Sequence, residues 1–120
     1  MSESKLRTLS MDFAIQILNL VEDLKAKREF VISSQIGRSG TSIGANIFEA
    51  NYAQGKKDFV SKMEIALKEA SETGYWIELL YRTNYLDEAT FQSLSQQCAT
   101  IRVLLIASAK KVKSKADTDD

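Results

Sequence analysis

The chain contains no proline in its 120 residues, and this absence constrains the fold more than any other feature. Proline is the strongest helix breaker, with a cost of about 3 kcal/mol in a helix interior. Apolar residues recur every three or four positions through most of the sequence, which is the spacing of an amphipathic helix. Residues typical of turns interrupt this spacing at three short places. The pattern therefore predicts four long helices joined by short links.

The predicted helices cover residues 8–28, 33–53, 56–83 and 87–113. Because short links place consecutive helices side by side and antiparallel, we predict an all-α, up-down-up-down four-helix bundle. A chain of this length forms one domain, residues 1–120, and its ends, residues 1–5 and 114–120, are expected to fray.

The expected helix ends depend on a few polar and glycine residues. Ser33 or Ser34 can cap the second helix by accepting a hydrogen bond from a free backbone N–H. Gly55 suits the left-handed conformation that ends a helix. Residues 84–86 form the next turn, and Asp87 can cap the fourth helix.

The stretch "GRSGTSIGANIFEANYAQGKK" at positions 37–57 poses the choice between a phosphate-binding loop and a helix. A Walker A loop requires Ser or Thr after its Gly-Lys pair, but Lys57 follows Gly55-Lys56. In a helix, one face gathers a core stripe made of Ile36, Gly40, Ile43, Ile47 and Ala50. The helical glycines Gly37, Gly40 and Gly44 each cost up to about 1 kcal/mol relative to alanine. We expect a closely approaching neighbouring helix to offset that cost.

A row of polar residues occupies a different face of the same predicted helix, namely Arg38, Ser42, Asn46 and Glu49. The third helix carries a second stripe outside its core face, made of Ile65, Glu69, Glu72, Trp76 and Leu79. Each is either a solvated face or a contact between subunits. Glu49 and Glu69 are the expected partners of Arg38. Removing one partner of a buried ion pair costs about 3 to 5 kcal/mol, so Arg38→Ala is predicted to destabilise the fold strongly or to dissociate an oligomer.

Composition excludes several kinds of chemistry. With no histidine, the chain lacks imidazole catalysis, Ser-His triads and the Glu-x-x-His pairs of di-iron bundles, so we predict no enzyme, metal or cofactor. Cys98 is the single cysteine and is interpreted as a core residue. The longest apolar run, residues 103–107, is far shorter than the roughly 18 residues of a membrane span. No secretory leader is evident, and a cytoplasmic location is expected.

Sixteen basic and sixteen acidic residues give zero net charge, which is unlike an avid nucleic-acid binder. Lysines nevertheless gather at the start of the third helix and near the C-terminus. The candidate nucleic-acid contacts are Lys56, Lys57, Lys62, Lys110, Lys111 and Lys113. Each is either a solvated surface residue or a phosphate contact.

Two segments, "SSQIGRSGTSIGANIFEA" (33–50) and "KKDFVSKMEIALKEASETGYWIELL" (56–80), resemble a bacterial family of four-helix bundles encoded in intervening sequences of 23S ribosomal RNA genes. The resemblance spans nearly the whole chain. It implies a ring-like homopentamer, and it implies that Arg38, Ser42, Asn46, Glu49 and Glu69 are signature positions. Many relatives have proline where this chain has Gly44. The accessory protein of diversity-generating retroelements, a basic pentamer, is a related bundle. The family supplies no established activity.

Two functions remain open from the sequence. The first is a homo-oligomer that binds RNA or DNA, in which a ring repeats a weak basic patch so that several subunits act together. The alternative is a scaffold that holds an unidentified protein partner without nucleic acid, which the neutral charge suits better.

Overall fold

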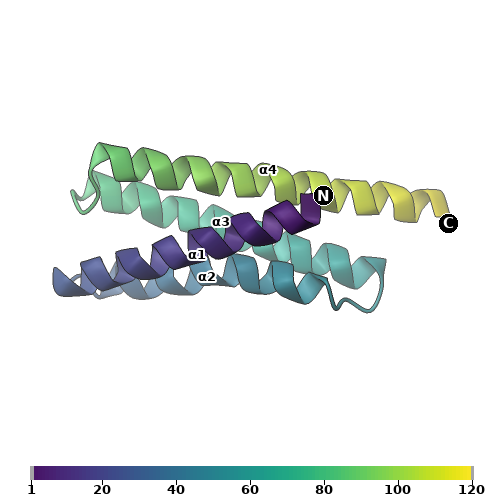
Figure 1. Ribbon diagram of the computed structural model, residues 1–120, viewed down its shortest axis with the longest axis horizontal. Coiled ribbons are helices and arrows are strands. Elements are labelled where there is room, and N and C mark those ends of the chain that lie inside the picture. Colours follow the sequence, from purple (N-terminus) through teal and green to yellow (C-terminus); the bar gives the residue numbers. More distant parts are fainter. Residues whose placement is uncertain (1, 120) are drawn as a thin grey trace.

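The computed structural model describes the backbone of residues 2–119 and the side chains of residues 5–115. The described backbone is all-α, with no strand. The four helices are α1 (Ser2–Ala26), α2 (Val31–Ala50), α3 (Lys56–Arg82) and α4 (Glu88–Asp119). They run alternately up and down in a rod of 53 × 22 × 20 Å (Figure 1). The predicted four-helix bundle is confirmed.

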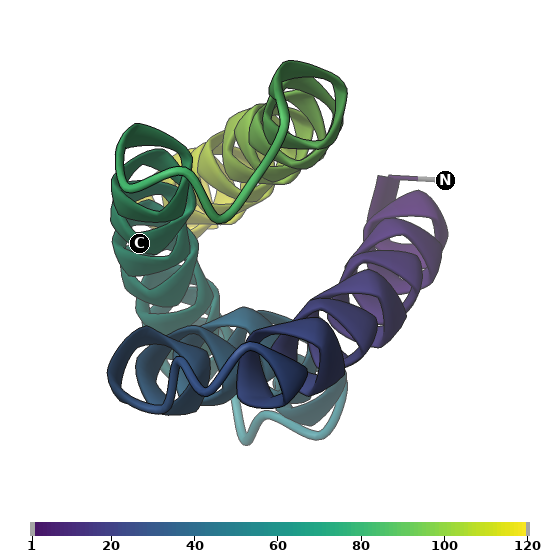
Figure 2. The ribbon, with the colours of Figure 1, turned by 90° about the vertical axis from the view of Figure 1, so that its left-hand side faces the viewer.

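Each helix packs against its neighbours in chain order, so that α2 lies between α1 and α3. Viewed along the rod, the helices follow a horseshoe, and α1 and α4 face each other across its most open side (Figure 2). The contact between α1 and α4 is the least extensive of the four. The first and last helices therefore border a seam, whereas α2 and α3 make the most extensive contact.

The core is formed by apolar side chains from all four helices. The core stripe predicted for the second helix is buried throughout, which confirms that part of the sequence interpretation. Cys98 is also buried, and its Sγ lies 3.2 Å from the carbonyl oxygen of Ala70. Burial raises the pKa of the Cys98 thiol to about 11, so the thiol stays protonated and unreactive at neutral pH. The interpretation of Cys98 as a core residue is confirmed.

The glycines of α2 lie against α1. A Cβ atom added at Gly40 would lie 2.8 Å from Cγ2 of Ile17, and one at Gly37 would lie 3.3 Å from Cγ2 of Val21. Both distances are shorter than an ordinary van der Waals contact, so the missing Cβ atoms allow α1 and α2 to approach closely. Residues 31–50 form an uninterrupted helix, and a phosphate-binding loop in that range is thereby excluded.

The predicted cap of α2 was wrong. Neither Ser33 nor Ser34 caps the helix, which begins two residues earlier at Val31. Instead, Oε1 of Glu29 accepts hydrogen bonds from the backbone N–H groups of Ile32, at 2.7 Å, and Ser33, at 3.0 Å. A carboxylate placed before the helix therefore satisfies two of the free donors of its first turn, and Ser33 is buried in that turn.

Other helix ends also differ from the predicted bounds. Helix α1 begins at Ser2 and ends at Ala26, two residues early, before Arg28 with its positive φ of 64°. Helix α2 ends at Ala50, so Gly55 does not end it; Gly55 instead precedes α3 with a φ of 134°. Helix α3 ends within one residue of its predicted bound, and α4 continues past residue 113 to Asp119. Fraying of the chain ends remains a prediction, and residues 1 and 120 lie outside the described residues.

Asp87 caps α4 as predicted, and it gives the fold a pH dependence. Its Oδ1 accepts a hydrogen bond of 2.7 Å from the Thr90 backbone N–H. This bond, with the Thr90 side chain and the more distant charge of Lys27, holds the pKa of Asp87 below its ordinary value of 3.8. A carboxyl whose pKa is lowered by folding stabilises the fold above its unfolded-state pKa, and this stabilisation is lost as the pH falls through the folded-state value.

We therefore expect Asp87→Ala to lower the free energy of unfolding at pH 7, where the carboxylate is charged, and to lower it less at about pH 3, below the ordinary carboxyl pKa, where the parent has lost part of this stabilisation. Urea unfolding at both pH values measures the two differences. The matched control is Asp87→Asn, which keeps a capping oxygen but has no charge to titrate. An equal loss at both pH values in Asp87→Ala would contradict this account of the cap.

Candidate functional site

A cluster of charged and aromatic side chains lies along the contact between α2 and α3. Arg38 Nη1 is 3.1 Å from Glu69 Oε1, and Arg38 Nη2 binds the carboxylate of Glu72. Trp76 Nε1 donates a 3.0 Å hydrogen bond to Glu72 Oε2. Glu69, Glu72 and Trp76 share one face of α3 because three or four residues separate them. We call Arg38, Glu69, Glu72 and Trp76 the Arg38 cluster.

The expected partnership of Arg38 with Glu69 is confirmed, and the one with Glu49 was wrong. Glu49 is eleven residues farther along α2, about 16 Å at the helical rise, and its Oε1 is instead 3.0 Å from Lys62 Nζ. Between the two ion pairs, Ser42 Oγ donates to the Arg38 carbonyl oxygen, at 2.6 Å, and Asn46 Nδ2 donates to the Ser42 carbonyl oxygen, at 2.9 Å. The predicted polar row therefore joins α2 to α3 by ion pairs at two separate places, Arg38 and Glu49.

The exposure of the Arg38 cluster decides how much it stabilises the fold. The Arg38 side chain is 49% exposed, against 19% for Glu69 and 31% for Glu72. The cluster is thus partly exposed in the single chain, and solvent screening lowers the expected cost of its loss there. The subunit contact at this face remains a prediction. The cluster links two helices, and each of its charged side chains has a partner within the cluster, so we propose a structural role for it.

Arg38→Ala is expected to destabilise the fold by about 1 to 2 kcal/mol, because it leaves two neighbouring carboxylates partly buried without a cation. Chemical denaturation measures this change, and a double-mutant cycle with Glu69→Ala isolates the coupling. The control is Arg82→Ala, which breaks a pair with Glu78 that is exposed and within one helix, and it should cost at most about 0.5 kcal/mol. A coupling energy near zero would contradict the structural role of the cluster.

The lysines predicted as nucleic-acid contacts come together at one end of the molecule. Because α3 begins where the antiparallel α4 approaches its end, the two groups of lysines lie at the same end of the rod, with the α2–α3 turn (Figure 1). Lys113 Nζ of α4 lies 2.5 Å from Glu64 Oε2 of α3. Lys56 and Lys115 line one shallow cavity. We call this region the basic end; its lysines are Lys56, Lys57, Lys62, Lys110, Lys111, Lys113 and Lys115.

These lysines differ in their availability. Lys62 is paired with Glu49, whose hydrogen bond and charge raise the lysine pKa above its ordinary value, and Lys113 is paired with Glu64. Lys57, Lys110 and Lys111 are exposed, and none lies within ion-pair distance of a carboxylate in the part of the chain that the structure describes. Three of the six predicted lysines therefore present an ammonium group directly to solvent.

Two aromatic residues at the basic end were missed as candidates. Phe48 and Tyr52 are 52% and 73% exposed, and their ring centroids are 5.4 Å apart. They lie at the end of α2 and in the following turn. In the sequence they flank the polar row of the second helix, and the available signal was an aromatic pair four residues apart, directly before the lysines of the third helix.

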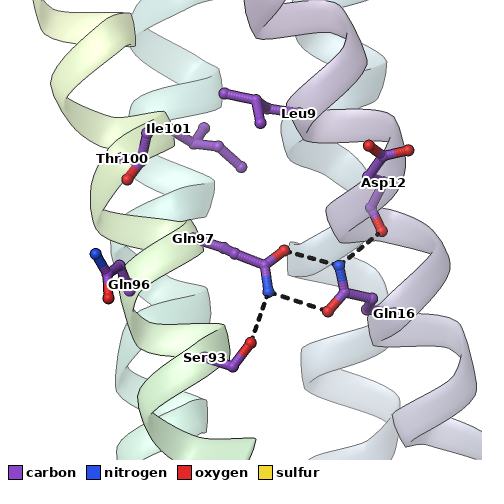
Figure 3. A pocket seen from close by; sticks show the side chains of 8 residues that line it. All are labelled: Leu9, Asp12, Gln16, Ser93, Gln96, Gln97, Thr100 and Ile101. Atoms are coloured by element: carbon purple, nitrogen blue, oxygen red, sulfur yellow. Dashed lines mark hydrogen bonds between the residues drawn. The ribbon is translucent and has the colours of Figure 1, made fainter.

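The seam between α1 and α4 holds a second polar feature, shown in Figure 3. Gln16 and Gln97 exchange two amide hydrogen bonds, of 2.7 and 3.0 Å, and Gln97 Nε2 also donates to Ser93 Oγ at 3.1 Å. These residues, with Asp12 at the edge, line a cavity of about 350 Å³. The amides are neutral and already bonded to each other. They join the two helices across the open side of the horseshoe and offer no reactive group.

Among the described residues, no three acidic, cysteine or histidine side chains are grouped so that they could hold a metal ion. No described helix combines the length and apolar character that a membrane span requires.

Comparison with known proteins places the chain in a family. The family model for the 23S rRNA-intervening sequence protein matches residues 2–107. A crystal structure of a protein of unknown function from Bacteroides thetaiotaomicron, assigned to the S23 ribosomal protein family, is similar at 48% sequence identity and a TM-score of 0.89. The match covers 92% of this chain and 99% of the other. No curated protein matches. The chain therefore belongs to the 23S rRNA-intervening sequence protein family.

Proposed function

We propose that this protein is a non-enzymatic, cytoplasmic helical bundle that associates with itself and binds RNA or DNA through the basic end. The observation that supports binding is the convergence of lysines from α3 and α4, among which Lys57, Lys110 and Lys111 have no carboxylate partner in the described structure. Phosphate contacts release condensed counterions, so even a modest number of lysines contributes to affinity. A neutral chain can therefore bind a polyanion where its charges are segregated.

Self-association would bring several copies of the basic end into one particle. Met11, Ile15 and Leu18 are 62%, 51% and 52% exposed and occupy one face of α1, on the side away from its buried residues. Val103 and Ile106 form a smaller exposed apolar surface on α4. Exposed apolar stripes of this kind are typical of subunit contacts. The family resemblance favours a homopentamer, in which each ring carries five copies of the basic end and binds a long strand with increased avidity.

Sedimentation equilibrium tests self-association. We expect a mass several times the 13.4 kDa of one chain, and we expect Ile15→Glu to reduce it because a charge would enter an apolar contact. A single species of 13.4 kDa at micromolar concentration would contradict this part of the proposal.

The binding proposal is tested by titrating a fluorescently labelled RNA of mixed sequence with the protein at about 50 and about 200 mM salt. If lysine–phosphate contacts hold the RNA, the affinity should fall steeply between the two conditions. Absence of binding at the lower salt concentration would contradict it.

Absence of RNA binding would favour the second candidate, a scaffold for an unidentified protein partner. One observation supports that candidate, because the exposed apolar stripe on α1 fits a partner protein as well as it fits a second copy of the chain. A protein that remains a monomer and binds no RNA would leave the scaffold as the better proposal.

A further inference from the structure

We infer that the basic end binds nucleic acid as a single strand, with unpaired bases stacked on Phe48 and Tyr52 and the backbone phosphates beside the lysines. This inference rests on the proposed function and specifies its ligand. The aromatic pair and the lysine-rich start of α3 are joined by one short stretch, residues 48–57, which follows the surface at the α2–α3 turn.

The exposure of the two rings supports this inference. Phe48 is 52% exposed and Tyr52 is 73% exposed, so most of each ring is free to contact a ligand. The rings are tilted by 52° with their centroids 5.4 Å apart, so they offer neighbouring but differently oriented faces. An aromatic ring stacks on the face of an unpaired base, and base pairs within a duplex are already stacked on each other. Paired rings beside cations are therefore typical of surfaces for single strands.

An apolar cavity at the same end of the bundle supplies a second place for a base. It has a volume of about 340 Å³ and is lined by apolar groups of Ala50, Ala53, Phe59 and Val112, with Lys56 and Lys115 at the same opening. This volume is near the lower limit for ligand pockets, about 300 Å³, and so suits one flat ring system. Lysines at its opening lie where the phosphates of a bound nucleotide would run.

Charge favours a nucleic acid over a second copy of this chain as the occupant. If two copies met through the basic end, Lys57, Lys110 and Lys111 of each would approach those of the other, and like charges across an interface are unfavourable. A single strand brings negative charge and flat apolar rings together. Both features of the surface, the cations and the exposed aromatic rings, then have a complementary partner.

The experiment compares three labelled ligands of about 20 nucleotides: a single strand, the same strand in a duplex, and a strand of equal length with abasic sites. Fluorescence anisotropy at low salt gives the affinities for the intact protein and for two variants. The test variant is Phe48→Ala with Tyr52→Ala, at exposed positions where folding should persist. The control is Tyr75→Ala, which removes an equally exposed ring about 28 Å along α3 from Lys56.

We expect the intact protein to bind the single strand about tenfold more tightly than the duplex or the abasic strand. The double variant should lose about tenfold in affinity for the single strand and little for the duplex, and Tyr75→Ala should match the parent. Equal binding of strand and duplex, or an unchanged double variant, would overturn the inference while leaving the proposed function intact.

Two further outcomes are decisive. If neither nucleic acid binds, the proposed function fails, and this inference fails with it. If the double variant changes the sedimentation mass and leaves strand preference unaltered, Phe48 and Tyr52 belong to a subunit contact, and the inference is overturned.

Discussion

Replacing Gly40 with leucine is expected to destabilise the fold by about 3 kcal/mol, the upper part of the range for overpacked cores. The Cβ atom alone would lie 2.8 Å from Cγ2 of Ile17, and Ile17 is fully buried, so neither side chain can turn toward solvent. The remaining atoms of leucine require α1 and α2 to move apart. Urea unfolding at pH 7 measures the loss, with an unchanged dependence on urea concentration as the sign that the native fold is kept.

The control for Gly40→Leu is Gly74→Ala, a substitution in the middle of α3. A Cβ atom there would meet only the Cys98 Sγ, at 4.0 Å, which is an ordinary contact. Alanine is favoured over glycine in a helix interior by about 1 kcal/mol, so we expect Gly74→Ala to stabilise the fold by up to that amount. If both variants change stability in the same direction, close packing at Gly40 does not explain why glycine occupies that position.

Reversing the charge of Lys57 and Lys111 together is expected to weaken binding to a single-stranded nucleic acid by roughly 100-fold at about 50 mM salt. Each change to glutamate removes a cation that would neutralise a phosphate and adds a repulsive charge. The slope of the logarithm of affinity against the logarithm of salt concentration should also fall, by about 1.4 for two lost contacts on a single strand. Anisotropy titrations at several salt concentrations measure both effects.

The matched control for this double reversal is Lys25→Glu with Lys27→Glu, at the opposite end of the bundle. It gives the molecule the same net charge, and both lysines are exposed. If attraction by overall charge dominates, the two double variants should weaken binding equally, and the basic end would lose its special role. The account expects the control to retain most of its affinity.

The sequence predicted the architecture well because helix periodicity repeats over many residues. The core positions of α2 and the close packing at Gly40 depend on that periodicity and on the absence of a Cβ atom. The pairing of Arg38 with Glu69 was predictable for a similar reason, since both residues lie on non-core stripes of consecutive helices.

Features at the helix ends were harder to predict because they depend on where the chain leaves the helix. Serine is a common N-cap residue, which made Ser33 a candidate, but Glu29 in the preceding turn accepts the hydrogen bonds instead. Helix α2 ends at Ala50, three residues before its predicted end, and this places Tyr52 in an exposed turn beside the lysines. Periodicity alone does not specify such a change, and the pairing of Tyr52 with Phe48 was therefore missed.

The partners of individual lysines also required the structure. Lys62 and Lys57 are similar in the sequence, yet only Lys62 lies across from a carboxylate on α2. The distance between residues 62 and 49 depends on the register of α3 against α2, which side-chain packing sets. The sequence therefore predicted six lysines as candidate contacts, and the structure separates the paired members from the exposed ones.

Lysine footprinting tests the central claim most directly, because the basic end and the opposite end both carry exposed lysines. The protein is acetylated briefly with and without a bound single strand, and mass spectrometry gives the modification at each lysine. The account predicts protection of Lys57, Lys110 and Lys111 by the strand, with Lys25 and Lys27 modified as in the free protein. Equal protection at the two ends, or protection of Lys25 and Lys27 alone, would contradict it.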